Sequence, residues 1–242
     1  MKKDIGVFGA HGYLGGETLK LCIDLKIPCV ALGRQIEAID ISILDGLTLI
    51  IDCGFPRDYY RRKTSGEYLK EIEKRVSFCH QYGIKYVYLT TFTSTVSDKS
   101  KYARLKNLLE EHIEMLGGEL LRLGLVIDSI NPGGRFLELQ SIIQKLPVVL
   151  IPSLNWFPIF TCSLNAYLAE VKNLVENDEF SKLQIGELQP LANVIRETAI
   201  DKKVLQLSDF MTSLLARLLP LIAFGKREGI KGISVKMIDY ER

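Results

Sequence analysis

The feature that most constrains this chain is a glycine-rich string near its N-terminus, GVFGAHGYLGG, which spans residues 6–16. A short apolar run, residues 5–8, leads into it, and a helical pattern over residues 17–25 follows. A strand, a glycine loop and a helix in this order are the context in which such a string binds a dinucleotide. The alternative is a strand-to-helix turn that is merely rich in glycine. The order of the three elements favours the dinucleotide site.

Each glycine of the string has its own expected role. Gly9 permits the tight turn after the strand, Gly12 lets the backbone approach a pyrophosphate, and Gly15 lets the helix pack closely on the strand. Tyr13 and Leu14 lie between the last two of these glycines and complete the expected cofactor-binding loop. The unpaired amide groups and the positive end of the helix dipole would then face the phosphates.

Composition and charge narrow the class of protein. The chain has 242 residues, 47% of them apolar, which is enough for a real hydrophobic core. The 31 basic residues nearly balance the 29 acidic ones, so no charge field argues for nucleic acid or an anionic membrane as a partner. Five cysteines without a Cys-x-x-Cys pair predict reduced thiols in a cytoplasmic protein, not a disulfide frame or a metal site. We expect no signal peptide, and the longest apolar run, residues 211–224, is too short to span a bilayer.

Strand and helix signals alternate through the first half of the chain, which is typical of a parallel α/β sheet. There the expected strands are residues 5–9, 28–32, 47–52, 85–89 and 119–127, and the expected helices are residues 17–25, 69–82 and 100–116. The pattern changes at residues 131–134, Asn-Pro-Gly-Gly. We therefore predict an α/β fold with a Rossmann-type doubly wound parallel sheet in residues 1–130. A small substrate-binding lobe would occupy residues 131–242, with a return of a strand or helix to the first domain left open.

The residue after the second strand bears on which dinucleotide is bound. An acidic side chain there binds the ribose 2′-hydroxyl of NAD, whereas an arginine meets the 2′-phosphate of NADP. Here the strand ends in Leu-Gly-Arg, with Arg34 at the tip and no acid. The sequence therefore favours NADP as the cofactor. NAD remains the alternative if Arg34 is an ordinary surface residue.

Tyr102 and Lys106 form the second group of candidate residues. On a helix, two residues four apart lie one turn from each other on the same face. A tyrosine has a pKa of about 10, but a nearby ammonium stabilises the tyrosinate and lowers that pKa. A hydroxyl-rich stretch, residues 90–95, comes just before this helix, and we expect one of its hydroxyl groups to hold a substrate carbonyl oxygen. A surface pair is the common alternative at this spacing, and the glycine loop and the hydroxyl-rich stretch argue against it.

Taken together, these motifs resemble the extended short-chain dehydrogenase/reductases that modify nucleotide sugars, over nearly the whole chain. Residues 9–15 are similar to the glycine motif of that superfamily, and residues 102–106 to its Tyr-x-x-x-Lys motif, with Glu110 where a glutamate often follows. Residues 31–41, with a short second crossover and an arginine after the second strand, resemble the dTDP-4-dehydrorhamnose reductase branch.

The resemblance implies an NAD(P)H-dependent oxidoreductase that reduces the 4-keto group of a nucleotide-activated deoxysugar. Tyr102 would donate the proton, Lys106 would bind the nicotinamide ribose, and Thr91, or else Thr93, would be the third catalytic residue. Two alternatives stay open. One is a nucleotide-sugar epimerase with tightly held NAD, and the other is a non-catalytic NADP-binding sensor or assembly protein.

The sequence departs from the superfamily after the third strand and after Thr91. Instead of the usual run of small residues, Cys53, Gly54 and Phe55 follow the third strand, and we expect all three near the cofactor. The stretch from Thr91 to the tyrosine motif is short. Phe and Thr follow Thr91 in place of the Asp-Glu pair of 4,6-dehydratases, which argues against dehydratase activity.

Candidates for substrate binding lie in the second half of the chain. Arg135 follows the Asn-Pro-Gly-Gly turn that begins at Asn131, and its guanidinium suits a diphosphate. Trp156 offers a ring that can stack on a base or a sugar, although it suits the core of the lobe equally. Residues 211–224 are expected to be helical and to serve either as lobe core or as the contact of a homodimer.

Overall fold

The computed structural model describes residues 4–33, 36, 39, 46–55, 62–92, 101–154, 158–199 and 201–214. The chain divides into two compact units. The first consists of residues 1–95, 101–123 and 163–185, and the second of residues 96–100, 124–162 and 186–242. Apart from residues 96–100, the chain thus passes into the second unit at residue 124, returns to the first for residues 163–185 and then ends in the second.

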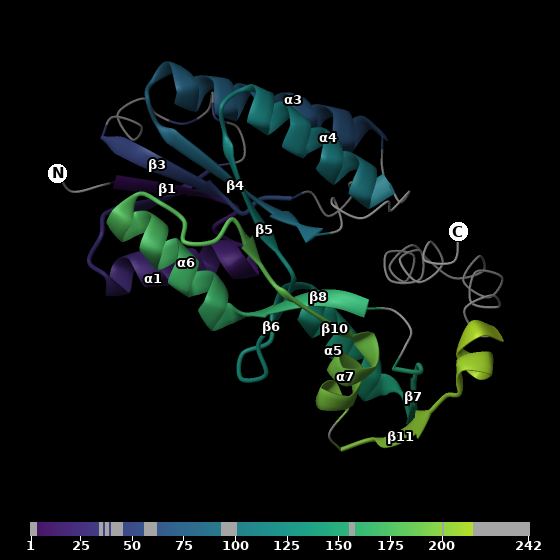
Figure 1. Ribbon diagram of the computed structural model, residues 1–242. Coiled ribbons are helices and arrows are strands. Elements are labelled where there is room, and N and C mark those ends of the chain that lie inside the picture. Colours follow the sequence, from purple (N-terminus) through teal and green to yellow (C-terminus); the bar gives the residue numbers. More distant parts are fainter. Residues whose placement is uncertain are drawn as a thin grey trace. The chain divides into compact units, whose positions relative to one another are not determined.

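The first unit is built on a six-stranded sheet with the order β2-β1-β3-β4-β5-β9, in which every neighbouring pair is parallel (Figure 1). Its strands are β1 (Asp4–Phe8), β2 (Cys29–Leu32), β3 (Leu47–Asp52), β4 (Lys85–Thr91), β5 (Glu119–Leu123) and β9 (Gln184–Ile185). Leu49, Ile50 and Ile51 are all buried, as expected for a strand covered on both faces. The predicted α/β class with a Rossmann-type parallel sheet is confirmed.

Helices cover both faces of this sheet. Helices α3 (Arg62–Gln81) and α4 (Lys101–Met115) lie on one face, and α1 (Tyr13–Asp24) and α6 (Leu164–Asn177) lie on the other (Figure 1). Helix α6 comes late in the chain, and its buried side chains include Tyr167, Val171 and Leu174. One face of the first unit is therefore completed by residues far from the glycine string.

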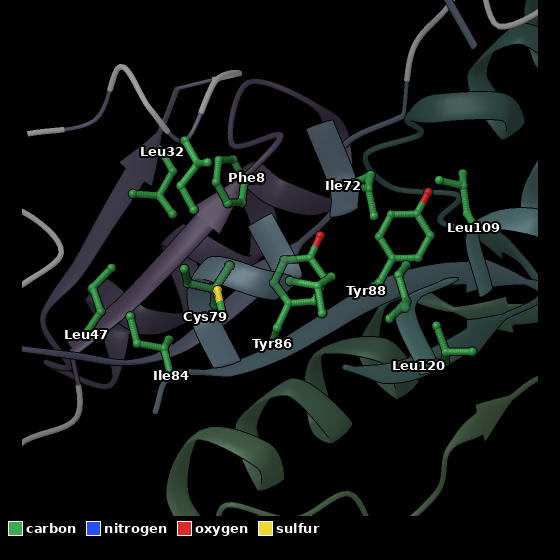
Figure 2. Packing of buried hydrophobic residues seen from close by; sticks show 14 of the residues in the cluster. Phe8, Leu32, Leu47, Ile72, Cys79, Ile84, Tyr86, Tyr88, Leu109 and Leu120 are labelled. Carbon is green, nitrogen blue, oxygen red and sulfur yellow. The ribbon is translucent and has the colours of Figure 1, made fainter. Parts of the chain in front are cut away.

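A hydrophobic cluster lies between the sheet and helices α3 and α4 (Figure 2). Tyr86 and Tyr88 alternate with Val87 along β4, so their side chains share the face that carries this cluster. Both tyrosines are buried, and burial of a large apolar side chain stabilises the fold by about 1.5–3 kcal/mol. Their hydroxyl groups need hydrogen-bond partners inside the core. Those partners lie in the candidate site.

One predicted strand is two strands in the structure. The apolar pattern predicts a single strand over residues 119–127, but β5 ends at Leu123 and β6 (Leu125–Ile127) belongs to a second sheet. Gly124 separates them, and a Cβ atom there would lie 2.7 Å from the backbone nitrogen of Thr161. The close approach of another strand at this glycine ends β5, and the apolar pattern does not reveal it.

The second unit contains two small sheets. The first has three strands in the order β10 (Glu187–Pro190), β8 (Pro158–Ser163) and β6, and β10 pairs with β8 in the antiparallel direction. The second has two strands, β7 (Val148–Ile151) and β11 (Lys203–Gln206), which pair in parallel. Helices α5 (Gly134–Lys145) and α7 (Leu191–Thr198) pack with β7 around Val149 and Ile151.

The described part of the C-terminal region contains a helix over residues 209–214. The rest of the apolar run that was predicted to be helical, residues 215–224, lies outside the described residues. Within the described residues, no helix is both long enough and apolar enough to cross a bilayer.

Candidate active site

The glycine string forms the turn between β1 and α1, at the carboxyl end of β1. In the sheet, β1 lies between β2 and β3, so the chain moves to one side after β1 and to the other side after β2. In open parallel sheets, ligands bind outside the carboxyl ends of the strands at such a switch point. The loops after β1 and β3 flank this position.

The glycine loop has the close packing that its sequence predicted. The amide of Gly12 donates to the carbonyl oxygen of Gly9 at 2.8 Å, and Gly9 has a φ of +71°, in the region that favours glycine. A Cβ atom at Gly15 would overlap the carbonyl oxygen of Gly9 and lie 2.9 Å from the Cα of Ala10. At Gly12, a Cβ atom would meet just one described atom within 4 Å, so the outer side of the loop is open.

Helix α1 begins at Tyr13, one turn earlier than the predicted start at residue 17. Glycine is a poor helix former, so the sequence pattern predicts the start of the helix only at Glu17, after Gly15 and Gly16. Gly12 is the N-cap and brings no side chain to cap the helix, and the first turn has no acidic residue. Tyr13 and Leu14, which are half-buried, therefore open a helix whose positive end is suited to phosphate.

The loop after β3 lies directly against the glycine loop. The amide of Cys53 donates to the carbonyl oxygen of Phe8 at 3.1 Å, and a Cβ atom at Gly9 would lie 2.7 Å from the nitrogen of Gly54. The hydroxyl of Tyr68, on α3, donates to the carbonyl oxygen of Gly54 at 2.6 Å. The two loops at the switch point are thus fixed against each other.

The carboxylate of Asp52 organises the turn after β3. Its Oδ1 accepts the amide of Gly54 at 2.8 Å, and its Oδ2 accepts the Arg75 guanidinium and the Tyr86 hydroxyl, both at 2.7 Å. The guanidinium of Arg75 also lies 3.9 Å from the centre of the Phe8 ring. The amino-acid sequence did not predict this network. Its only signal was a charged residue at the end of an apolar strand, followed by an arginine on the buried side of the next helix.

Cys53 connects the same turn to the opposite face of the sheet. Its thiol lies 3.7 Å from the hydroxyl of Tyr167, on α6, and that hydroxyl lies 2.6 Å from the hydroxyl of Thr18, on α1. Burial raises the pKa of the Cys53 thiol to about 12, so it stays protonated and unreactive at neutral pH. Cys53 is therefore a structural member of the site and not a nucleophile.

Tyr102 and Lys106 lie on α4, as predicted. The side chain of Lys106 is buried, and its amine donates to the hydroxyl of Tyr88 at 2.9 Å and to the carbonyl oxygen of Leu89 at 3.3 Å. The ring of Phe55 lies 4.4 Å from this amine, and the Phe55 and Tyr102 rings meet edge to face with centres 5.3 Å apart. The structure thus brings the Tyr-Lys pair and the loop after β3 together.

The amine of Lys106 has an unusual environment for a cation. Burial lowers its pKa to about 7, although the charges of Asp52 and Glu110 act in the opposite direction. Each of these carboxylates has its own cationic partner, Arg75 and Arg122 respectively. Lys106 can therefore gain or lose a proton near neutral pH, which is the range in which acid–base groups work.

Helix α4 is held in place by a second buried network. Glu110, one turn beyond Lys106, accepts the hydroxyl of Thr90 at 2.6 Å and the Arg122 guanidinium at 2.8 Å. These bonds join α4 to β4 and β5. They also commit the hydroxyl of Thr90 to a structural role, so it is not available for a substrate.

Thr91 is the last residue of β4, at the same end of the sheet as the glycine loop. Because side chains alternate along a strand, Thr91 points to the face opposite to that of Thr90. Its catalytic role stays a prediction. Arg34, Thr93 and Trp156 lie outside the described residues, and the predictions made for them stay predictions.

Asn131 and Arg135 belong to the second unit. The amide of Asn131 donates to Asp128 at 3.1 Å, and the guanidinium of Arg135 lies 3.7 Å from Glu138 on the exposed side of α5. Their proposed part in substrate binding stays a prediction. Among the described residues, no group of three or more His, Cys, Asp or Glu side chains is placed to hold a metal ion.

Solved structures with the same architecture include three kinds of nucleotide-sugar enzyme. A NAD-dependent NDP-hexosamine 5,6-dehydratase of tunicamycin biosynthesis has a TM-score of 0.67 at 15% identity, covering 85% of this chain and 84% of that chain. The dTDP-4-dehydrorhamnose reductase of Bacillus anthracis, solved with NADP, has a TM-score of 0.65 at 12% identity, with coverages of 87% and 86%. The UDP-N-acetylglucosamine 4-epimerase of Bacillus cereus has a TM-score of 0.65 at 13% identity, with coverages of 84% and 84%.

At these identities the likeness concerns the fold. No protein-family profile matches the sequence. No curated protein matches it in sequence either. The neighbours confirm, at the level of the fold, the resemblance that the motifs indicated. The chain therefore has a Rossmann-type fold, which it shares with these enzymes of nucleotide sugars.

Proposed function

We propose that the protein is an NAD(P)H-dependent oxidoreductase that reduces the 4-keto group of a nucleotide-activated deoxysugar. One observation carries the proposal. A continuous set of contacts runs from the glycine loop through Gly54 and Phe55 to Tyr102 and Lys106, at the carboxyl ends of β1 and β3. Such a set lets one dinucleotide place its phosphates on the loop and its nicotinamide beside the Tyr-Lys pair.

The residues at this end of the sheet fit a dinucleotide. The open outer side of Gly12 and the uncapped start of α1 suit the diphosphate. Lys106 would bind the nicotinamide ribose, and Thr91 would hold the substrate carbonyl oxygen. The reduced nicotinamide, when bound, supplies the hydride.

Tyr102 would give its hydroxyl proton to the oxygen of the carbonyl group as the hydride arrives at its carbon. The tyrosinate that remains is stabilised by the ammonium form of Lys106, one helical turn away. Arg34 supports NADPH as the preferred form of the cofactor, through the charge complementarity of a guanidinium and the 2′-phosphate.

The test is a Tyr102→Phe variant, assayed with NADPH and a 4-keto sugar nucleotide. We expect it to bind NADPH as the unmodified protein does and to lose turnover by about 100-fold or more, because general acid catalysis contributes 10²–10⁴-fold. Turnover that survives in Tyr102→Phe contradicts the assignment of Tyr102. A protein that retains NAD through purification and interconverts two sugar nucleotides without net cofactor use is an epimerase instead.

One observation favours a non-catalytic NADP-binding protein as the second candidate. The amine of Lys106 is already engaged by Tyr88 and Leu89 and is covered by the ring of Phe55. NADPH binding together with no turnover of any keto sugar nucleotide would support this candidate over the reductase.

A further inference from the structure

Phe55 lies at the centre of the candidate site. Its ring centre is 4.4 Å from the amine of Lys106, 5.3 Å from the centre of the Tyr102 ring and 5.9 Å from that of Tyr68. Both ring pairs are close to perpendicular, with interplanar angles of 74° for Tyr102 and 79° for Tyr68. Edge-to-face pairs at these separations are favourable and have a defined geometry. The ring of Phe55 is therefore wedged between α3 and α4.

The backbone that carries Phe55 is also held in place. The amide of the preceding residue, Gly54, donates to Asp52, and its carbonyl oxygen accepts the hydroxyl of Tyr68. Asp52 is itself fixed by Arg75 and Tyr86. A residue held through both its ring and its neighbouring peptide is suited to position other groups.

The amine of Lys106 shows what Phe55 contributes. Of its three N–H donors, two have oxygen acceptors, on Tyr88 and Leu89, and the rings of Phe55 and Tyr88 lie within 4.5 Å of the nitrogen. Among the described residues, no carboxylate lies within ion-pair distance of this amine. The Phe55 ring thus stands where water or a carboxylate would otherwise solvate the ammonium.

The charged groups around Lys106 come from four elements. Asp52 of β3 is paired with Arg75 of α3, and Glu110 of α4 is paired with Arg122 of β5. Tyr68 of α3 and Tyr88 of β4 stay neutral, because burial raises the pKa of each well above its usual value. With the carboxylates already paired, apolar cover decides how easily Lys106 carries a charge.

We propose that Phe55 is a positioning residue for the Tyr102–Lys106 pair, because its ring fixes the ring of Tyr102 and keeps water from the amine of Lys106. The inference rests on the proposed reductase function and deepens it. It separates two effects of one ring. The edge contact orients the proton donor, and the apolar cover sets the protonation of the lysine.

The experiment compares Phe55→Leu and Phe55→Ala with Phe78→Leu as a matched control. Phe78 is also a half-buried phenylalanine with an aromatic partner, since its ring centre lies 4.4 Å from that of Tyr82. It lies on α3, next to Cys79 in the sequence and away from the Tyr102–Lys106 pair. Three quantities are measured: the Kd of NADPH, kcat and kcat/KM across pH, and the titration of the Lys106 Cε resonance in protein carrying ¹³C-labelled lysine. A Lys106→Met variant assigns that resonance.

We expect the Lys106 resonance to titrate near pH 7 in the unmodified protein and to move upward by about one pH unit or more in Phe55→Ala, because water reaches the amine. Leucine keeps most of the apolar cover, so Phe55→Leu should leave the titration nearly unchanged. Both variants should lower kcat at saturating NADPH by about tenfold, since Tyr102 loses its edge contact, and the measured Kd of NADPH sets the cofactor concentration that saturates each variant. Phe78→Leu should change none of these quantities.

An unchanged titration in Phe55→Ala, or an unchanged kcat in Phe55→Leu, overturns the proposal. The NMR titration does not depend on turnover, so it tests the role of Phe55 separately from the proposed reductase function. If the unmodified protein turns over no keto sugar nucleotide but the Lys106 titration moves in Phe55→Ala, the reductase function fails and the control of Lys106 by Phe55 stands. If Phe55→Ala does not fold, Phe55→Leu decides through kcat measured at saturating NADPH.

Discussion

The guanidinium of Arg75 donates a 2.7 Å hydrogen bond to the carboxylate of Asp52, and both side chains are buried beneath the loop that follows β3. This ion pair stands between the hydrophobic cluster of α3 and α4 and the turn that touches the glycine loop. It therefore links the stability of the first unit to the shape of its candidate cofactor site.

Arg75→Met should destabilise the protein strongly. Loss of one partner from a buried ion pair costs about 3–5 kcal/mol, because the other charge is left buried without compensation. The free energy of unfolding in urea measures this change. The double variant Arg75→Met, Asp52→Asn should recover part of the loss, and Lys20→Met, which removes an exposed pair with Glu17, should cost less than about 1 kcal/mol. Equal losses for the single and the double variant would contradict the coupling.

Gly15→Ala should abolish NADPH binding, because the added Cβ overlaps the Gly9 carbonyl that shapes the phosphate loop. Gly16→Ala is the matched control. Its Cβ would lie 3.5 Å from the carbonyl oxygen of Ala10, an ordinary contact, and alanine in a helix is favoured over glycine by about 0.5–1 kcal/mol. Fluorescence titration with NADPH should show binding retained in Gly16→Ala and lost in Gly15→Ala. Equal affinities in the two variants would rule out the proposed position of the cofactor.

Lys106 should make the stability depend on pH. Its pKa is about 7 in the folded protein and has an ordinary value of 10.5, so between these values the unfolded chain binds a proton that the folded chain does not. The free energy of unfolding then rises with pH, by up to about 1.4 kcal/mol per pH unit. Urea unfolding between about pH 6 and pH 7.5 covers the start of this rise and stays about one pH unit below the ordinary thiol pKa of about 8.5, because ionisation of unfolded thiols acts in the opposite sense. Lys106→Met should have a flatter profile, and an equal slope in both proteins would exclude Lys106 as the cause.

The same group should shape the pH profile of turnover. The ammonium form of Lys106 stabilises the tyrosinate of Tyr102, so kcat/KM for reduction should fall as pH rises through about 7. Stopped-flow assays of NADPH oxidation across pH give this profile. A profile that stays flat through this range would mean that the protonation of Lys106 in the free enzyme does not limit the reaction.

Glu110→Gln should weaken the attachment of α4. Glutamine can still accept from Thr90, but it loses the charge that pairs with Arg122, and a hydrogen bond to a charged group contributes about 1.5–3 kcal/mol. Urea unfolding should show a loss of this size. The exposed neighbour Glu111→Gln should change stability by less than about 0.5 kcal/mol. Equal losses in the two variants would show that the buried network contributes no more to the free energy of unfolding than an exposed carboxylate does.

The regular parts of the fold could be predicted because their signals are local. Strand β3 has the bounds that its apolar run indicated, and the order of strand, glycine loop and helix correctly predicted the turn after β1. The Tyr-Lys spacing likewise placed Tyr102 and Lys106 one turn apart on α4. These predictions depend on neighbours within a few positions of each other in the chain.

The features that sequence did not reveal depend on distant neighbours. Nothing in the run around Asp52 names Arg75 as its partner, 23 residues away. The break at Gly124 follows from the approach of Thr161, and the place of Phe55 over Lys106 follows from the packing of α3 against α4. A linear pattern records which residues are apolar or charged, but not which of them meet.

The return of residues 163–185 to the first unit has a consequence for how this protein is made. The hydroxyls of Thr18 and Tyr167 lie side by side although 149 residues separate them in the chain. On the ribosome, the face of the sheet beneath α6 stays uncovered until residue 177 has emerged, and the edge at β5 stays unpaired until β9 follows. Long-range closure of this kind slows folding, and an open sheet edge is a site of aggregation in the meantime. A nascent chain halted after β5 would therefore contain the glycine loop and the Tyr-Lys pair, but its sheet would lack the cover of α6 and the pairing of β5 with β9.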